Sequence, residues 1–490
     1  MSRTLPAVAL LLAFAVLAGC FGKDDTPAPP VVEQPPAPSI TTIAPLAEPV
    51  LVTLPDHRIA EFMVNRDPND PDHLVTAYGD YDSYGGTLNC GFSVSKDGGA
   101  TWVVANPIEG FAGPHLEFDG WVDFDEQGGV HAICLRESGP ETTTETWPFY
   151  FNSADGGLTW KDVMHIPTEP AGRSTDKSVL AVGRDGTVYA AVSDILGTTN
   201  DNGTTWVPMT DIMGSKDGRP VPASVGVLNG MVEDNLGTMY LLGLGSGDSV
   251  WVGHSSDKGV SWTAAEFGAF QIPPGYNDQN RWVRQEPWTA VPTMAHDPVS
   301  DEVWVTYQSW DEGYGGYLTH IWRSTDHGAS FAETAVPAFA SPACSDPCHV
   351  THPALAFDLD GRVGLIAQLT KDEGIVKVVQ FSASDDHGAT WLAPFELSST
   401  DGTDSWRNPN AFAPGMGNAQ AIATGVAADP RTAHNVALGL GLSTAVSELQ
   451  MRWNGEYWGL AATSKGFVAM WIDHSNDGRP QLYSRLLKVE

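Results

Sequence analysis

The feature that most constrains the fold is an eight-residue phrase that the chain repeats six times. The first copy runs from Ser95 to Trp102 and reads SKDGGATW in one-letter code. Every copy keeps the order hydroxyl residue, aspartate, glycine, hydroxyl residue and aromatic residue. The central aspartates are 46 to 69 residues apart, which fits one four-stranded unit per copy. These aspartates are Asp97, Asp155, Asp201, Asp257, Asp326 and Asp386.

The chemistry of the phrase predicts a tight turn between two strands. The aspartate accepts backbone N–H bonds across the turn, and glycine supplies a positive φ. The last two residues resume a strand, and the aromatic ring offers a large apolar surface to bury against the next unit. This ring is a tryptophan in five copies and Phe331 in the other. The phrase is therefore expected to be structural, without a part in catalysis or metal binding.

The repeated residues resemble the Asp-box, and roughly residues 50–490 resemble the sialidase-like Asp-box (BNR repeat) β-propeller superfamily. The resemblance implies an all-β propeller of four-stranded blades. The superfamily includes sialidases, other glycosidases and non-catalytic binding proteins, so the resemblance implies the fold more sharply than the activity.

Strand patterns outside the phrase set the expected number of blades. Each unit opens with two short strands around a polar turn, as in Ala60–Val64 with His73–Tyr78. After Trp391 the phrase is absent, but residues 422–453 read as a further hairpin and strand. We expect seven blades, with six and eight as alternatives. The last set of strands is Trp458–Ala462, Phe467–Ile472 and Gln481–Leu487, and Val50–Leu54 is a candidate for its missing outer strand.

The charge of the chain excludes one class of partner. The formal net charge is −34 and the pI is about 4.5. A surface that binds nucleic acid needs concentrated Lys and Arg, so no nucleic-acid partner is expected. The acidic balance is explained by solubility. No cofactor is expected, and the chain is expected to be a monomer.

The first 49 residues read as an export and anchoring segment. Arg3 precedes the apolar run Leu5–Leu17, which is too short for a permanent membrane span. The run ends in LAGC, which resembles a lipobox, so residues 1–19 would be a signal peptide and Cys20 a lipidated N-terminus. A plain signal peptide is the alternative. Residues 20–49 are proline-rich and are expected to form a disordered tether to the outer side of the cell membrane.

Four further cysteines are expected to form disulfides in an exported chain. Three pairings are possible. Cys344 with Cys348 closes a small loop, whereas Cys90 and Cys134 fall on strands of neighbouring units, and these two bonds are favoured. The alternative is a metal site in the segment Cys344-x-x-x-Cys348-His349-x-x-His352. An oxidising compartment favours the disulfide, so no metal is expected.

Propeller geometry predicts which loops carry a site. If the repeated phrase occupies third-to-fourth strand turns, those turns share the bottom face with first-to-second strand turns. Long loops gathered on the opposite, top face are where function is usually carried. Trp310, in one of these loops, is a candidate binding residue. The expected top-face loops are Gly79–Gly86, Phe267–Pro287, Trp310–Gly316, Val336–Thr351 and Ser398–Gly417.

Several of these top-face residues resemble parts of a sialidase site. Arg58 opens the segment RIA, which resembles the segment whose arginine grips the substrate carboxylate. Asp82 lies near the place of the family's general acid, with Asp80 as its rival. Tyr457 begins a first strand, like the family's nucleophilic tyrosine, and Asp473 is the candidate for its carboxylate partner. A phenol can replace a carboxylate nucleophile where the sugar carries its own carboxylate.

The departures from the family pattern are as informative about function as the similarities. The family expects three arginines around the substrate carboxylate and a glutamate that activates the tyrosine. His352 and Gln368 stand in the unit where a glutamate and an arginine are expected. Arg281, Trp282 and Arg284 form the densest mixture of positive charge and aromatic rings, and with His352 they are candidate binding residues.

Three functions compete on this evidence. The first is an extracytoplasmic, lipid-anchored propeller that binds glycans on its top face without sialidase chemistry. The second is an active exo-glycosidase of sialidase type that uses Arg58, Asp82 and Tyr457. The third is a scaffold or assembly propeller that binds another protein. The incomplete arginine set favours the first.

Overall fold

Strands account for all the regular secondary structure in the described part of the chain. The described residues belong to one unit, Pro38–Glu490. The computed structural model describes residues 40–82, 88–105, 117–137, 146–166, 177–192, 195–208, 225–245, 249–271, 292–344, 348–371, 376–400, 458–473 and 480–490.

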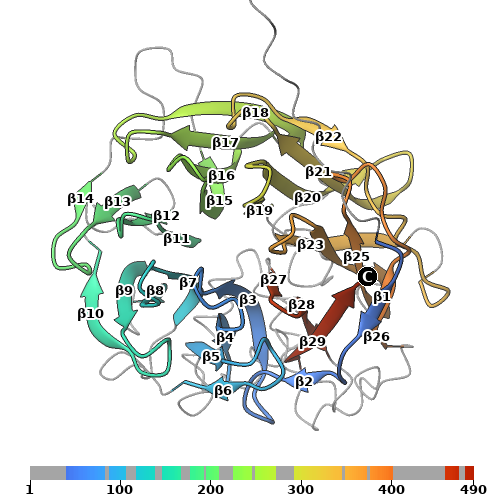
Figure 1. The fold of residues 1–490 in the computed structure, drawn as a ribbon, viewed down its shortest axis with the longest axis horizontal. Helices are drawn as coiled ribbons and strands as arrows, with labels where there is room; N and C mark the ends of the chain where they lie inside the picture. Colours follow the sequence, from blue (N-terminus) through green and yellow to red (C-terminus); the bar gives the residue numbers. More distant parts are fainter. Residues whose placement is uncertain are drawn as a thin grey trace, which may run out of the picture. The chain divides into compact units, whose positions relative to one another are not determined.

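These strands form seven small antiparallel sheets around a central axis, which confirms the predicted seven-bladed propeller (Figure 1). Within each blade the strands follow one another from the axis to the rim. Blade 1 is β3 (Ile59–Arg66), β4 (Leu74–Asp80), β5 (Asn89–Ser95) and β6 (Val103–Val104). Blade 2 is β7 (Glu117–Phe124), β8 (Val130–Glu137), β9 (Thr146–Ser153) and β10 (Lys161–His165). Blade 3 is β11 (Ser178–Val182), β12 (Val188–Val192), β13 (Ile195–Thr199) and β14 (Val207–Pro208).

The next three blades repeat the same order from the axis outward. Blade 4 is β15 (Val225–Glu233), β16 (Met239–Gly245), β17 (Ser249–Ser255) and β18 (Thr263–Ala269). Blade 5 is β19 (Thr293–His296), β20 (Val303–Asp311), β21 (Gly316–Ser324) and β22 (Ala332–Thr334). Blade 6 is β23 (His349–Phe357), β24 (Val363–Lys371), β25 (Val376–Ser384) and β26 (Phe395–Thr400). The hairpin and strand expected within residues 422–453 lie outside the described residues.

Blade 7 combines the two ends of the chain. Its inner strands are β27 (Leu460–Thr463), β28 (Gly466–Asp473) and β29 (Gln481–Val489). On the rim, β29 pairs with β1 (Ile43–Pro45) and with β2 (Val50–Leu51). The expected outer strand at Val50–Leu54 is present in its first two residues as β2. β1 lies within residues 20–49, which were expected to form a disordered tether, so residues 43–45 of that segment belong to the propeller instead. This pairing covers the outer edge of β29 and joins both ends of the described chain in one blade, which closes the ring.

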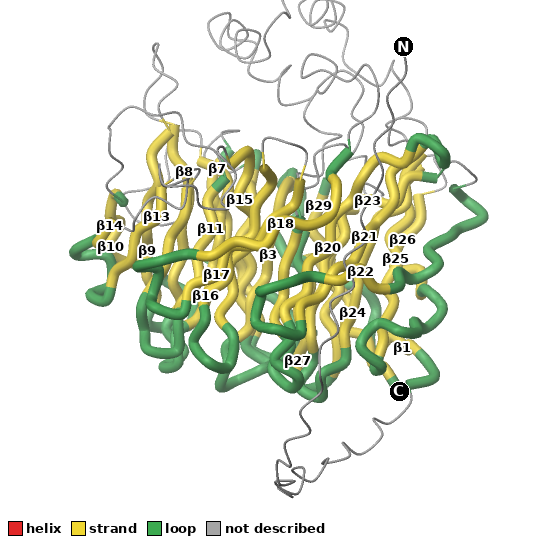
Figure 2. Tube along the Cα trace, turned by 90° about the horizontal axis from the view of Figure 1, so that it is seen from above, coloured by secondary structure: helices red, strands yellow, loops and turns green. Residues whose placement is uncertain are grey.

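The repeated phrase forms the turn between the third and fourth strands of blades 1 to 6, as expected. In the first copy, Asp97 Oδ1 accepts hydrogen bonds from Ser95 Oγ at 2.9 Å and from the Thr101 backbone N–H at 2.8 Å. The other oxygen, Oδ2, accepts from Thr101 Oγ1 at 2.6 Å. These turns and the first-to-second strand turns lie on the same face, which we call the bottom face, along the lower edge of Figure 2. The top face is the opposite one.

In blades 1, 2, 5 and 6 the glycine of this turn is pressed against the preceding blade of the ring, whereas the aromatic residue was expected to be buried against the next unit. Gly157 of blade 2 has a φ of +91°, and a Cβ there would lie 2.8 Å from Val75 of blade 1. Gly388 of blade 6 has the same relation to Trp304 of blade 5, also at 2.8 Å. Only glycine combines this positive φ with such a close approach. The turn therefore fastens each blade to the one before it.

The aromatic residue that ends each phrase reinforces this fastening. Trp160 of blade 2 packs on Phe92 of blade 1 with a centroid distance of 4.4 Å, and Phe331 of blade 5 stacks on Phe267 of blade 4 at 4.2 Å. A covalent bond joins blades 1 and 2 as well, because Cys90 and Cys134 form the predicted disulfide.

We predict that Trp160→Ala destabilises the propeller by about 3–5 kcal/mol, because a large ring is removed from a closed seam. Trp160 is only 6% exposed. Trp102→Ala is the matched control: its ring is half-buried and its indole N–H donates to Ser484 Oγ at 2.9 Å. The control should cost clearly less in urea-induced unfolding. Equal losses in the two variants would contradict this account of the seams.

Candidate functional site

Backbone strain draws attention to the innermost strands. Non-glycine residues rarely adopt a positive φ, and such residues concentrate at functional sites. Glu61 (47°), Asp119 (54°), Lys177 (56°) and His352 (51°) do so here, within or directly before a first strand. All four are buried. The strands β3, β7 and β23 each carry a register shift at this position, which turns the side chain away from the regular ladder.

Three of these residues form an ion network that spans three blades. Lys177 Nζ donates to Glu61 Oε1 and to Asp119 Oδ1, each at 3.1 Å. The Lys177 backbone N–H donates to Asp119 Oδ2 at 3.0 Å. Because Glu61 lies in blade 1 and Lys177 before the first strand of blade 3, the lysine reaches past blade 2. The network therefore ties the inner strands together near the top of the axis.

A second set of charges lies beside it, where β3 begins and β4 ends. The Arg58 guanidinium forms a bidentate pair with Asp82, with Nε to Oδ2 at 2.8 Å and Nη2 to Oδ1 at 2.7 Å. The Arg58 backbone N–H donates to Asp82 Oδ2 at 2.7 Å. His57 Nδ1 lies 2.8 Å from Asp80 Oδ2. The predicted residues Arg58, Asp80 and Asp82 are thus brought together, but each already has a partner.

We call this group the top-axis cluster. It contains four carboxylates, two permanent cations and one histidine. Tyr81 belongs to it, because Glu61, Arg58, Lys177 and Asp119 all act on its hydroxyl electrostatically. The members are His57, Arg58, Glu61, Asp80, Tyr81, Asp82, Asp119 and Lys177.

The electrostatics separate the two candidate acids. Burial raises the pKa of Asp80, and this effect outweighs the opposing hydrogen bond from His57. Burial also acts to raise the pKa of Asp82, but the hydrogen bonds and charge of Arg58 outweigh it and lower the pKa. Burial raises the pKa of the Tyr81 phenol strongly, and the carboxylate of Glu61 adds to the effect. Asp82 is therefore ionised at neutral pH, and Tyr81 is a neutral phenol.

Glu117, at the start of β7, is a buried carboxyl that the sequence analysis missed. Burial raises its pKa to about 7, and Arg136, whose Nη2 lies 3.2 Å from Oε1, only partly opposes this. A pKa near neutrality suits a general acid. Because Glu117 is completely buried, it cannot touch a substrate in this structure, and its place beside the Cys90–Cys134 disulfide indicates a structural role.

The other predicted residues lie apart from the cluster or outside the described residues. Asp473 Oδ2 accepts hydrogen bonds from the Ser398 hydroxyl of blade 6 and from Trp471 Nε1 at 3.2 Å. Asp473 thus lies at the seam of blades 6 and 7. Its proposed partner Tyr457 is outside the described residues, as are Arg281, Trp282 and Arg284.

His352 and Trp310 occupy two different environments. The His352 ring packs on Trp458 with a centroid distance of 5.2 Å, and its backbone N–H donates to Gln308 Oε1 at 2.9 Å. His352 is buried, so it contributes to a seam and not to a surface. Trp310 is half-buried at the end of β20, and its ring meets the edge of Tyr317 at 5.4 Å.

The alternative metal site among the cysteines is not formed. Cys344 and Cys348 form the predicted disulfide, so their sulfurs are not available as thiolates. The small loop is held to blade 5 through Tyr314, whose hydroxyl donates to the Cys348 carbonyl at 3.0 Å. His352 is directed to Trp458.

A sequence signal for the missed residues does exist. Glu61 interrupts the apolar run IAEFMV, Asp119 precedes GWV, and Lys177 precedes SVLAV. In a propeller, a charged residue near the start of an otherwise apolar first strand indicates a position near the axis on the top face. Which of these charges meet could not be read from the sequence, because Lys177 pairs with a blade that is not its neighbour.

Comparisons with known proteins give no family for this chain. No protein-family model matches the sequence, and no curated protein matches it. Solved structures with a similar fold include a protein of unknown function from Dyadobacter fermentans, at 16% identity and a TM-score of 0.44. That match covers 68% of this chain and 96% of the other.

Sialidases are among the similar structures. The Trypanosoma rangeli sialidase in complex with the inhibitor DANA matches at 14% identity and a TM-score of 0.44, over 71% of this chain and 59% of its own. A mutant of the NanB sialidase from Streptococcus pneumoniae matches at 10% identity and a TM-score of 0.47, over 65% of this chain and 67% of its own. At these values the likeness carries no argument about chemistry, and the fold rests on the strand pairing itself.

We predict that Glu117 makes stability depend on pH. Its pKa in the folded state, about 7, lies above the ordinary 4.5, so unfolding releases a proton between these pH values. Stability should therefore fall as pH rises from about 4.5 to about 7, by on the order of 3 kcal/mol for this group. Glu117→Gln should remove that slope in urea-induced unfolding at pH 4.5 and pH 8. Parallel pH profiles for the two proteins would show that Glu117 is not the source.

Proposed function

We propose that this chain is an extracytoplasmic binding protein that recognises a neutral glycan on the top face of its propeller and does not hydrolyse it. The observation that carries the proposal is the bidentate pair of Arg58 and Asp82. In a sialidase-type reaction, the arginine must be available for the substrate carboxylate and the acid must hold a proton.

Arg58 and Asp82 do not meet these two requirements in the described geometry. The Arg58 side chain is 13% exposed, and Asp82 already occupies the fork that would receive a substrate carboxylate. Asp82 has a lowered pKa and is ionised at neutral pH, so it has no proton to donate to a leaving group. These two points favour binding over hydrolysis.

The charge of the chain favours a neutral ligand. The top-axis cluster holds more carboxylates than cations, and the whole chain carries a formal charge of −34. An acidic sugar such as a sialoside would be repelled by this field. Carboxylate oxygens instead accept hydrogen bonds from sugar hydroxyls, and Asp82 retains 26% exposure for this purpose.

Aromatic rings supply the second kind of contact that a sugar ring uses. Trp310 and Tyr314 are half-buried where β20 and β21 meet on the top face. An apolar ring face combined with a few placed polar groups is the usual lining of a ligand site. Trp310 and Tyr314 are therefore the aromatic residues of blade 5 that we propose for stacking on a sugar ring.

The proposal includes export and anchoring through Cys20. It is supported by the LAGC segment and by the two disulfides, which need an oxidising compartment. No helix in the described part of the chain is long and apolar enough to cross a membrane. The first described residues lie beside the C-terminal strand on the bottom face, where the Thr42 N–H donates to the Glu490 carbonyl at 2.8 Å.

A glycan array followed by titration calorimetry tests the binding, and fluorogenic sialosides and neutral glycosides test hydrolysis. We expect binding of neutral glycans and no turnover. Asp82→Asn should weaken binding about tenfold or more, because a charged acceptor is lost. Arg184→Gln is the matched control and should bind the glycan normally. Arg184 lies on the bottom face, where its guanidinium donates hydrogen bonds to Asn235. Turnover of a sialoside that Asp82→Asn abolishes would instead establish the glycosidase.

Fractionation of the cells that produce the protein tests the anchor. Cys20→Ser should move the protein from the membrane to the soluble extracytoplasmic fraction, because the lipid is its only expected attachment. Thermal unfolding of this variant should match that of the parent, since residue 20 lies before the propeller. Complete retention of Cys20→Ser in the membrane fraction would contradict lipid anchoring.

A further inference from the structure

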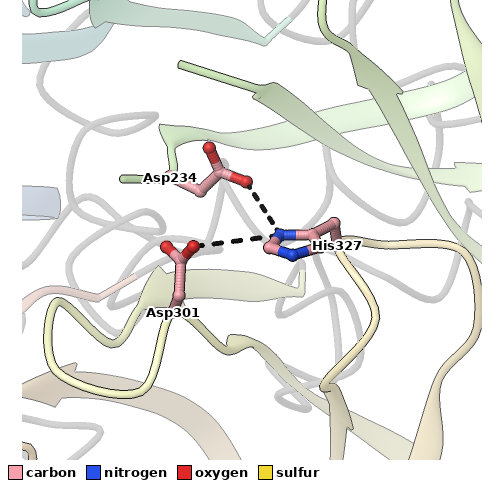
Figure 3. A group of neighbouring side chains, drawn as sticks. All are labelled: Asp234, Asp301 and His327. Atoms are coloured by element: carbon pink, nitrogen blue, oxygen red, sulfur yellow. Dashed lines mark ion pairs between the residues drawn. The ribbon is translucent and has the colours of Figure 1, made fainter. Parts of the chain in front are cut away.

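Three side chains that can ligate a metal meet on the bottom face, at the seam of blades 4 and 5 (Figure 3). Asp234 begins the turn between β15 and β16, and Asp301 ends the turn between β19 and β20. His327 lies in the repeated turn of blade 5, directly after Asp326, with a φ of 56°. One ligand atom from each of the three lies within 4.8 Å of the others. The group is remote from the top-axis cluster, on the opposite face.

Both carboxylates are held in place by donors to Oδ1 and direct Oδ2 to His327. Asp234 Oδ1 accepts from the Leu236 and Thr238 backbone N–H groups at 2.9 and 2.8 Å. Asp301 Oδ1 accepts from the Asn235 backbone N–H at 2.9 Å and lies 2.8 Å from His296 Nε2. The Oδ2 atoms of both point to the imidazole of His327, as Figure 3 shows.

The spacing of these atoms suits a shared cation better than a shared proton. His327 Nδ1 lies 3.4 Å from Asp234 Oδ2 and 3.9 Å from Asp301 Oδ2. Both distances exceed the usual hydrogen-bond range of about 2.7–3.2 Å. Ligands at about 2.0–2.1 Å from a tetrahedral ion lie about 3.4 Å apart. Small rotations of Asp301 and His327, which are 20% and 49% exposed, would complete the geometry.

The outer contacts also resemble those of a metal site. Ligating carboxylates are generally fixed by further hydrogen bonds. Asp234 is completely buried, and the Tyr240 hydroxyl donates to its Oδ2 at 2.8 Å. The exposed side of His327 leaves an open path for an ion and for a water ligand. An imidazole nitrogen with two carboxylate oxygens suits zinc, whereas magnesium prefers oxygen ligands alone.

We propose that Asp234, Asp301 and His327 bind a divalent transition-metal ion, with zinc as the best match, and that this ion fastens blade 4 to blade 5. A cation at this seam would join two carboxylates from different blades in a strongly acidic protein. The site is independent of the glycan-binding proposal, because no residue is shared between them.

The chain contains its own control at the next seam. His387 occupies in blade 6 the same place in the repeated turn as His327, with the same φ of 56°. Its Nδ1 lies 3.4 Å from Glu302 Oε2 of blade 5. Among the described residues, the group of Asp234, Asp301 and His327 is the one set of three potential ligands that meets the distance condition, and His387 belongs to no such set. His387→Ala therefore removes an equivalent seam histidine without touching the proposed site.

The experiment uses tag-free full-length protein, stripped with a chelator, and zinc chloride as the probe. Calorimetry should give saturable binding near one ion per chain, and the melting temperature should rise with zinc concentration. His327→Ala and Asp301→Asn should each weaken zinc binding at least about tenfold and reduce the shift in melting temperature. His387→Ala should retain the affinity and the shift of the parent. Magnesium chloride should give no comparable shift.

Circular dichroism of each variant without metal shows whether it folds. If His327→Ala does not fold, Asp301→Asn, which keeps a side chain of the same shape, decides the question. Absence of saturable zinc binding to the folded parent would overturn the proposal. Equal affinity in the parent, His327→Ala and Asp301→Asn would also overturn it, because the ion would then lie elsewhere on the acidic surface.

Discussion

The structure depends on the seams between blades. A four-stranded blade has two faces and little core of its own, so its apolar side chains are buried only when a neighbour covers them. The repeated turn supplies the fastening on the bottom face. In four copies its glycine approaches the preceding blade too closely for a side chain, and its aromatic residue covers part of that blade, as Trp160 covers Phe92. Local turn chemistry and long-range packing are thus specified by the same eight residues.

The fold could be predicted from the sequence because each signal was local and repeated. The hydroxyl and aspartate of the phrase specify a turn wherever they occur, and six copies at similar spacing imply six blades. The short strands near Val50 and Gln481 then allowed a seventh blade to be built from both ends. The direction in which the aromatic rings pack was predicted wrongly. Turn chemistry is the same whichever neighbour the ring covers, so the sequence contains no local signal for that choice.

The site was less predictable because it depends on which charges pair. Arg58, Asp80 and Asp82 were identified as top-face residues, and the structure brings them together. The pairing of Arg58 with Asp82 could not be inferred, since the sequence contains no signal that distinguishes an ion pair from contact with a ligand or solvent. Lys177 and Glu61 were missed because their contact skips a blade and depends on backbone bulges that have no compositional signature. The repeats in the sequence predict the fold, but they do not predict which charged residues form pairs.

The composition of blade 7 constrains when the propeller can finish folding. Thr41 and Glu490 are hydrogen-bonded partners although they are 449 positions apart in the chain. At a synthesis rate of about 5–20 residues per second, β1 is made on the order of half a minute before its partner β29. Until then the faces of blades 1 and 6 that blade 7 covers lack that neighbour, and blades 1 to 6 form an open arc. β29, which follows all the other described strands in the chain, therefore converts the arc into a ring, so the ring cannot close before β29 has been made.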